Sequence, residues 1–241
     1  MRFELLTSTK KVVLILSHMK INYLGHSSFL ITGKTNTGEE VSLVTDPFDP
    51  KAVGLSYSKQ KADIVTISHN HPDHFYLKNI EGEANNGYFL IETPGEYELK
   101  GLRVFGIKSF HDDKNGLDRG GNIMYVYDFA EATIAHLGDI GHTLDSNQLE
   151  LLEEVDILMI PVGGKFTVDP KIAMQIIESI EPKIVIPMHY KSEKMIPAYD
   201  ELSTLQGFLA EAGTEATTEK NLIIKAKSDL PPETKIIPLS F

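Results

Sequence analysis

Three histidines and one aspartate lie within six consecutive positions, in the segment 69–74 with the sequence HNHPDH. The segment directly follows a run of apolar and β-branched residues that is typical of a buried strand. In extended backbone, residues two positions apart point the same way, so His69 and His71 can face one ion together. The proline that follows turns the chain, which lets Asp73 and His74 face a second position nearby. One short loop could therefore serve two metal ions.

The residue types in this loop suit a catalytic metal site. Imidazole nitrogen and carboxylate oxygen bind zinc and similar divalent ions at about 2.0–2.2 Å, and a catalytic site keeps one position open for water or substrate. The chain has no cysteine, so any metal has to be held by His, Asp or Glu. The simpler interpretation is a polar surface turn that contains histidines. The spacing of several potential ligands favours the metal site.

Other short motifs extend this pattern along the chain. They are Tyr23-Leu24-Gly25-His26-Ser27-Ser28-Phe29-Leu30-Ile31, Asp46-Pro47-Phe48, His136-Leu137-Gly138-Asp139 and Pro187-Met188-His189-Tyr190. Together with the His-x-His-x-Asp-His segment and in this order, they resemble the metallo-β-lactamase superfamily, in particular a compact branch of lactonase-like and uncharacterised hydrolases. The resemblance spans about residues 19–191. The His-x-His-x-Asp-His motif is specific for the superfamily but says little about substrate.

The resemblance implies a dinuclear metal centre and assigns its ligands. The first metal would be held by His69, His71 and His111, and the second by Asp73, His74 and His189. Asp139 would bridge the two cations and lower their mutual repulsion. The glycines on both sides of Asp139 let the backbone approach closely and direct its carboxylate inward. His136 and His142 remain alternatives to His111.

Two bound metals would lower the pKa of a water molecule toward about 7 and polarise a scissile carbonyl or phosphoryl oxygen. Asp73 could also orient the resulting nucleophile, and His136 or His142 could donate a proton to the leaving group. The candidate substrate-binding residues are Lys165, Tyr190 and Lys191. For Lys165, a solvated side chain is the simpler interpretation.

Two polar residues near the motif are predicted to support it. His26 lies in an expected turn between the first two strands, where hydrogen bonding to loop backbone or support of a ligand is favoured over direct metal ligation. Asp46 could hold a ligand histidine in one tautomer, or could cap the turn that follows it.

Charge and hydropathy limit the classes of partner that the protein is expected to bind. The 23 basic and 34 acidic residues give a net charge of -11, which disfavours bulk nucleic-acid binding. No apolar run approaches the roughly 20 residues needed to cross a membrane, and no signal peptide is recognisable. The absence of cysteine fits a reducing cytoplasm. We expect a cytoplasmic protein with a small-molecule substrate, without nucleic-acid or membrane partners, that acts alone or as a homo-oligomer.

Hydrophobic periodicity alone supports a mixed α/β domain, and the resemblance implies a four-layer αββα sandwich. The predicted strands are residues 21–24, 28–32, 41–45, 64–68, 88–92, 102–108, 122–129, 132–137, 157–161, 183–187, 221–226 and 235–239. The predicted helices are residues 75–80, 146–153, 170–181 and 199–212, and residues 93–96 are predicted to form a turn. We expect a single domain over residues 19–241, with residues 1–18 as an N-terminal extension.

These observations predict a metal-dependent hydrolase that acts on a small-molecule lactone or phosphoester through two divalent ions. Zinc is the first expectation, and manganese and iron are alternatives, because imidazole and carboxylate bind all three. Two other functions remain open: a metal-binding regulator or interaction module without turnover, and a mononuclear-iron dioxygenase. An open, water-filled cleft at His69 and Asp139 would favour the enzyme.

Overall fold

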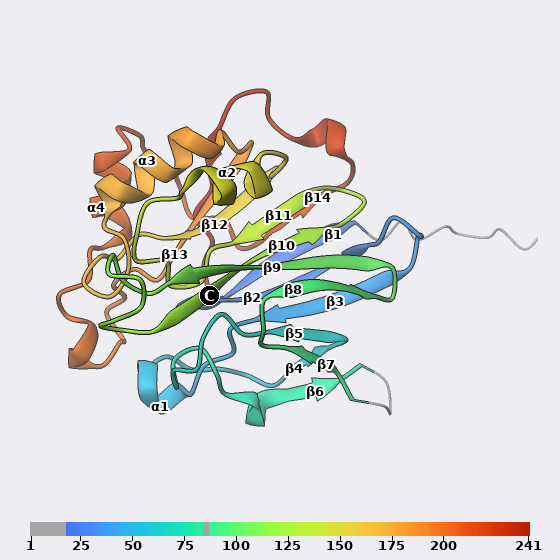
Figure 1. Ribbon diagram of the computed structural model, residues 1–241, viewed down its shortest axis with the longest axis horizontal. Coiled ribbons are helices and arrows are strands. Elements are labelled where there is room, and N and C mark those ends of the chain that lie inside the picture. The colour runs from blue at the N-terminus through green and yellow to red at the C-terminus, as the bar shows by residue number, and fades with distance from the viewer. Residues whose placement is uncertain (1–17, 84–86) are drawn as a thin grey trace, which may run out of the picture.

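Two β-sheets packed face to face form the centre of the protein, as the computed structural model shows for residues 18–83 and 87–241 (Figure 1). The first sheet has six strands, in the spatial order β14 (Leu222–Ile224), β1 (Met19–Gly25), β2 (Ser28–Lys34), β3 (Glu40–Thr45), β5 (Ile64–Thr66) and β7 (Phe89–Ile91). The second has seven, in the order β15 (Lys235–Ile236), β13 (Ile184–Met188), β12 (Ile157–Pro161), β11 (Thr133–His136), β10 (Gly121–Asp128), β9 (Leu102–Phe110) and β8 (Gly95–Leu99). The expected N-terminal extension lies outside the described residues, apart from His18.

Side chains alternate between two apolar regions along the central strands of the first sheet. Leu43 and Ile64 belong to the main core, which also contains Tyr125 and Ile134 of the second sheet. Val44 and Val65, the next residue on each strand, pack into a second apolar cluster on the opposite face. A strand buried on both faces has an unbroken apolar sequence, which explains why these strands were recognisable.

Helices cover the outer face of the second sheet (Figure 1). They are α2 (Ser146–Leu152), α3 (Pro170–Ile180) and α4 (Leu205–Glu211). The side chains of Asp145 and Asp169 cap α2 and α3 by accepting hydrogen bonds from backbone N–H groups of the first turn. In the described ranges, no helix is long and apolar enough to span a membrane.

The outer layer on the first sheet is thin. It consists of α1 (Pro50–Val53), a 3₁₀ turn (Leu77–Asn79) and a two-stranded sheet of β4 (Gln60–Ala62) and β6 (Ile80–Gly82). The expected four-layer α/β sandwich is therefore confirmed, with one of its helical layers reduced to a few short elements.

Three local predictions were wrong. The helix expected over 75–80 is replaced by a 3₁₀ turn (Leu77–Asn79) and the first residue of β6. Gly95 and Glu96, expected in the turn 93–96, instead begin an edge strand (Gly95–Leu99). The helix expected over 199–212 begins at Leu205, because the Thr204 side chain caps it by accepting from the Gly207 N–H. Tyr199 instead ends a separate 3₁₀ turn (Pro197–Tyr199).

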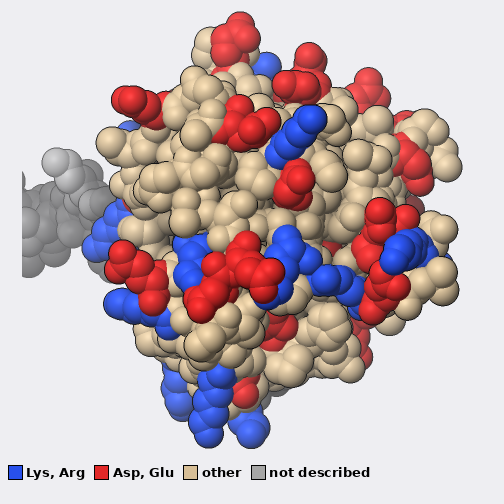
Figure 2. Space-filling model, turned by 90° about the vertical axis from the view of Figure 1, so that its left-hand side faces the viewer, with Lys and Arg blue, Asp and Glu red and all other residues tan. Residues whose placement is uncertain are grey.

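The loops that carry the potential metal ligands leave the two sheets at one end of the sandwich. The 69–74 segment follows β5, His111 follows β9, Asp139 follows β11 and His189 follows β13. Figure 2 views the molecule from the side on which these loops lie, and there basic and acidic side chains alternate in a band across the middle of the face.

Asp63, between β4 and β5, links β3 of the first sheet to the turn between β8 and β9 of the second. Its Oδ2 accepts hydrogen bonds from the Ser42 N–H and hydroxyl, both at 3.0 Å, and its Oδ1 pairs with the Lys100 ammonium. Burial raises the pKa of Asp63, but the hydrogen bonds from Lys100 and Ser42 outweigh burial and lower that pKa below its ordinary value. The stability that this carboxylate contributes is therefore present above about pH 4 and is lost as the pH falls through the lower folded pKa.

We expect Asp63→Asn to lower the free energy of unfolding by about 1–3 kcal/mol at pH 7, because charged hydrogen bonds are lost. Urea unfolding as a function of pH should show this deficit shrinking below about pH 4, where Asp63 becomes protonated first in the unfolded chain and then, at lower pH, in the folded protein. The control is Glu81→Gln, which removes an exposed ion pair with Lys59 and should lower the free energy of unfolding much less than Asp63→Asn does. An equal deficit at pH 3 and pH 7 would contradict the assignment.

Candidate metal centre

The loop after β5 is held in a compact turn by its own backbone and by the second sheet. The His71 carbonyl accepts hydrogen bonds from the N–H groups of His74 at 2.9 Å and Phe75 at 2.8 Å, which closes the turn around the proline. From the other sheet, the Ile123 N–H donates to the Ser68 carbonyl at 2.9 Å. The four potential ligands of this loop are therefore fixed relative to both sheets.

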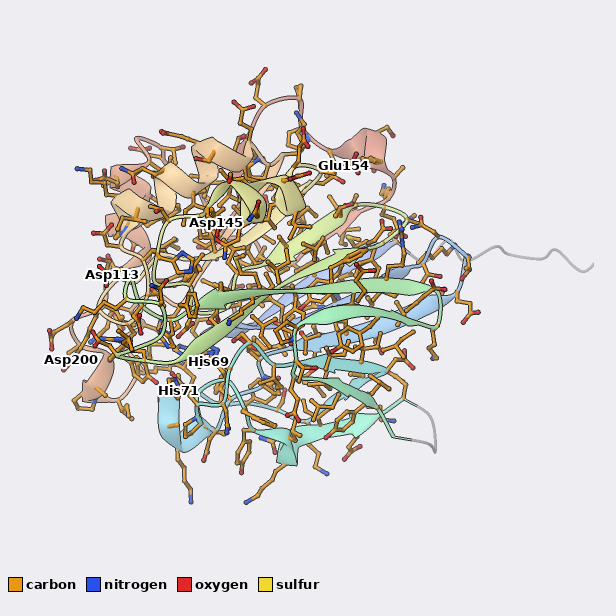
Figure 3. All side chains as sticks on the ribbon, in the orientation of Figure 1. His69, His71, Asp113, Asp145, Glu154 and Asp200 are labelled. Carbon is orange, nitrogen blue, oxygen red and sulfur yellow. The ribbon has the colours of Figure 1, made fainter. Side chains whose placement is uncertain are left out.

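Potential metal donors form three overlapping groups among the described residues, and within each group the donor atoms lie within 4.8 Å of one another. The first group is His69, His71 and His111, the second is His26, Asp73, His74 and His189, and the third is His69, His74 and Asp139. Figure 3 places His69 and His71 at the end of the sandwich where the loops gather. The third group joins the other two into one centre.

Asp139 lies at the middle of this centre. Its Oδ2 is 3.1 Å from His189 Nε2, 3.2 Å from His74 Nε2 and 3.3 Å from His111 Nε2. The preceding Gly138 has a φ of +55°, and a Cβ there would lie 2.3 Å from Asn122 Oδ1, so only glycine fits. Burial raises the pKa of Asp139, but the surrounding histidines lower it well below its usual range, so this carboxyl is ionised.

Several buried donor atoms of the centre have no hydrogen-bond partner. They include Nε2 of His69, His74 and His189, and Oδ1 of Asp139. A buried polar atom without a partner costs about 1–3 kcal/mol. Burial also lowers the pKa of His69 well below its ordinary value, which keeps that ring in the neutral form that binds metals. These unpartnered imidazole and carboxylate atoms fit divalent metal ions.

Asp46 contacts the ring of His74 directly and that of His69 through Ser68. Its Oδ2 accepts hydrogen bonds from His74 Nδ1 at 2.9 Å and from the Ser68 hydroxyl at 2.6 Å, and its Oδ1 accepts from the Ser68 N–H at 2.7 Å. The Ser68 hydroxyl is also 2.9 Å from His69 Nδ1. Of the two roles considered for Asp46, the structure shows contact with a histidine ring. Ser68 was missed in the sequence, although it directly precedes the motif.

Residues 20–189 match the family model described as the beta-lactamase superfamily domain. The chain belongs to this family. Similar relatives include a UPF0173 metal-dependent hydrolase of Thermoplasma acidophilum, which is 29% identical over an alignment of 223 positions that covers 84% of this chain and 94% of that protein. Another, of Natranaerobius thermophilus, is 30% identical over an alignment of 202 positions that covers 76% of this chain and 88% of that protein.

A solved structure from Thermotoga maritima, assigned to the Zn-dependent hydrolases of the metallo-beta-lactamase superfamily, is also similar. It shares 32% sequence identity and a TM-score of 0.73, and the match covers 92% of this chain and 98% of that one. The superfamily inferred from the sequence motifs is therefore confirmed.

The structure brings all seven residues that the superfamily resemblance assigns as ligands to the centre. His111, the assigned ligand, lies beside Asp139, whereas the two alternatives, His136 and His142, belong to none of the three donor groups. His136 is fully buried, with Nε2 2.8 Å from the Ser27 carbonyl and Nδ1 accepting from the Gly138 N–H. His142 Nε2 accepts from the Phe110 N–H, and its Nδ1 is 2.7 Å from the Thr143 carbonyl.

His136 and His142 were expected to donate a proton, and the structure places both rings against backbone groups. Both ring nitrogens of each histidine are engaged with backbone groups, so neither ring presents a free N–H to a leaving group.

The three residues expected to bind substrate make contacts within the protein. Tyr190 lies in the core, with 8% of its surface exposed, and packs against Tyr23. Lys165 Nζ is 2.7 Å from Glu201 Oε1, and Lys191 pairs with Asp200. Both lysines thus bind the segment 192–203, which carries Tyr199.

Tyr199 is a centre residue that the sequence did not reveal, because no local motif marks it. Its hydroxyl donates to Asp73 Oδ2 at 3.0 Å, and its ring centroid lies 5.3 Å from that of His26. Burial and the nearby Asp73 carboxylate raise the pKa of Tyr199 far above its ordinary value, so the phenol stays protonated. Burial also lowers the pKa of His26 to about 4.

We expect Asp46→Asn to weaken metal binding by about 10- to 100-fold, the usual cost of losing a residue that orients a ligand histidine. An amide cannot accept all three hydrogen bonds that the Asp46 carboxylate accepts from Ser68 and His74. The affinity is measured by competition with a chelator. Asp49→Asn is the matched control, since Asp49 lies in the same segment but caps α1 through the Lys51 N–H. Equal affinities in Asp46→Asn and the wild type would contradict this role.

Proposed function

We propose that this chain is a hydrolase that uses two divalent metal ions to attack a lactone or phosphoester of a small molecule. Zinc is the first expectation for both ions. The observation that carries the proposal is the position of Asp139, whose single Oδ2 atom lies within 3.3 Å of histidines from both donor groups. Membership of the beta-lactamase superfamily, together with the names of the relatives, supports metal-dependent hydrolysis.

The donor set divides naturally between two ions. His69, His71 and His111 would hold the first, Asp73, His74 and His189 the second, and the ionised Asp139 would be shared by both. When bound, such ions supply a water molecule of lowered pKa and polarise the oxygen of the scissile bond. A carboxylate between two cations reduces their repulsion, which supports a pair of ions at this place.

The chain's own residues hold this arrangement in place. Asp46 and Ser68 fix the rings of His69 and His74, so that their Nε2 atoms face the centre. Asp73 Oδ2 accepts a hydrogen bond from the Tyr199 hydroxyl at 3.0 Å and lies 3.2 Å from His26 Nε2. Burial raises the pKa of Asp73, but His74 and His26 lower it below its usual range, so Asp73 is ionised and can orient a water molecule by accepting its hydrogen bond.

Access to the centre supports an enzyme over a closed metal-binding module. His71 is only partly buried, whereas the other histidines of the first group are buried, so the first group is open to solvent on one side. A hollow of about 470 Å³ adjoins His69, and its lining includes Phe75, Pro94 and Lys108. A cavity of this size suits a small molecule, and Lys108 could bind an anionic group of it.

The mixed charge of this face supports a small-molecule substrate over a nucleic acid, because acidic side chains interrupt the basic ones (Figure 2). We further propose a cytoplasmic location, in line with the absence of cysteine.

The test is the metal content of protein purified without added metal, measured by mass spectrometry, with lactone and phosphodiester hydrolysis assayed on the same samples. We expect near two zinc or manganese ions per wild-type chain. Asp139→Ala should lower the metal content and reduce hydrolysis by at least about 100-fold, since both ions lose a ligand. The control Asp113→Ala removes an exposed carboxylate of the 112–120 loop and should change neither.

Two results would contradict the dinuclear hydrolase. One iron per chain would favour oxygen chemistry, and a wild-type chain that binds no metal even after reconstitution would remove the basis for hydrolysis. Circular dichroism of Asp139→Ala separates a lost site from a lost fold.

A further inference from the structure

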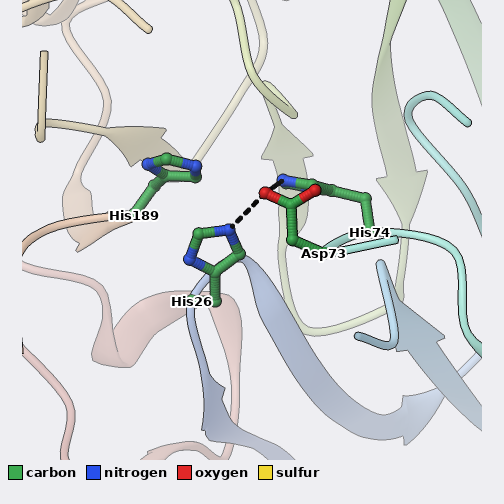
Figure 4. A group of neighbouring side chains, drawn as sticks. All are labelled: His26, Asp73, His74 and His189. Carbon is green, nitrogen blue, oxygen red and sulfur yellow. Dashed lines mark hydrogen bonds and ion pairs between the residues drawn. The ribbon is translucent and has the colours of Figure 1, made fainter. Parts of the chain in front are cut away.

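The side chain of His26 points into the metal centre, although the sequence favoured a supporting role in the turn between β1 and β2. The side chain is fully buried, and its Nε2 lies 3.2 Å from Asp73 Oδ2 (Figure 4). Its ring centroid is 4.0 Å from that of His189 and 5.1 Å from that of His74. One donor atom of His26 therefore lies within 4.8 Å of a donor atom of each of the three residues assigned to the second metal.

The spacing of these atoms fits a common ion. Two donors that bind one ion at about 2.0–2.2 Å, with an angle of about 90–110° at the ion, lie roughly 2.8–3.6 Å apart. The His26 Nε2 to Asp73 Oδ2 distance of 3.2 Å falls in this range, as does the 3.1 Å between His189 Nε2 and Asp139 Oδ2.

The turn itself does not explain why a histidine stands at this position. The backbone of His26 provides the structural contacts of the turn, since its carbonyl accepts from the His189 N–H at 2.8 Å and from the Tyr23 hydroxyl at 2.7 Å. The ring contributes to neither bond. Its Nδ1 is buried without a hydrogen-bond partner, so the ring's described polar contact is the one with Asp73.

His26 also occupies a strained backbone conformation, with a φ of +56°. For a residue other than glycine, such conformations cost about 1–3 kcal/mol and persist mainly at functional sites. His189, to which His26 is hydrogen-bonded, has a φ of +54°. Both strained residues direct their rings at the same place, where Asp73 and His74 also lie (Figure 4).

We propose that His26 Nε2 is a direct ligand of the second metal ion, together with Asp73, His74 and His189. This inference rests on the proposed dinuclear centre and adds an imidazole to the second position. The two ions would then have different surroundings. Besides the shared Asp139, the first would be held by three imidazoles, and the second by three imidazoles and the Asp73 carboxylate.

The competing role for His26 is to hold Asp73 by a hydrogen bond. Tyr199 performs that function, because its hydroxyl donates to the same Oδ2 at 3.0 Å. His26 and Tyr199 therefore form a matched pair for experiment. Both can donate a hydrogen bond to Asp73, but only His26 carries an imidazole.

The first experiment is a crystal structure of the zinc-loaded wild-type chain, with the ions located by anomalous scattering. We expect His26 Nε2 at about 2.0–2.2 Å from the second ion. The inference would be overturned by a second ion held by Asp73, His74 and His189, with His26 more than about 3 Å away and hydrogen-bonded to Asp73. A chain that binds no second ion would overturn both this inference and the dinuclear proposal, whereas a second ion without His26 would leave the dinuclear proposal intact.

The second experiment compares His26→Asn with Tyr199→Phe. Asparagine tolerates the left-handed backbone of position 26, so the turn is preserved. We expect His26→Asn to weaken binding of the second equivalent of Co²⁺ by at least about 100-fold and to change its visible absorption, which reports the ligands. Tyr199→Phe should weaken binding less than tenfold and leave the spectrum unchanged. Equal losses in the two variants with an unchanged Co²⁺ spectrum would assign His26 to the hydrogen bond alone.

Discussion

The burial of an ionised carboxylate among imidazoles is the constraint on which this end of the molecule depends. Asp139 has 1% of its surface exposed, and its Oδ2 lies within 3.3 Å of three histidine rings. A buried charge is tolerated only where opposite charge or strong hydrogen bonds compensate its lost hydration. The preceding Gly138, which has no room for a side chain, is part of the same constraint, since it lets the carboxylate reach the centre.

The sequence predicted the features of the centre that are local in the chain. The 69–74 motif and Asp139 were recognisable because ligand types occur at short spacing after apolar strands. His111 and His136 could not be separated in the same way, since both follow or end a strand. The difference is tertiary: the ring of His136 is turned to the Ser27 carbonyl, whereas that of His111 faces Asp139.

Residues that join the centre from irregular segments were harder to predict. Tyr199 lies in a 3₁₀ turn that looks helical in the sequence, and its contact with Asp73 spans 126 positions. The edge strand β8 was missed because its glutamates and glycine resemble a turn, and its pairing with β9 makes it a strand. The sandwich was easier to predict, since both its core strands and its capped helices α2 and α3 carry strong local signals.

The donors of the centre come from both sheets. His26 and the 69–74 loop extend from the first sheet, whereas His111, Asp139 and His189 extend from the second. Ions held between them would link segments up to about 160 positions apart in the chain, much as a disulfide would in an oxidising compartment. Because the chain has no cysteine and therefore no disulfide, bound metal ions would cross-link the two sheets.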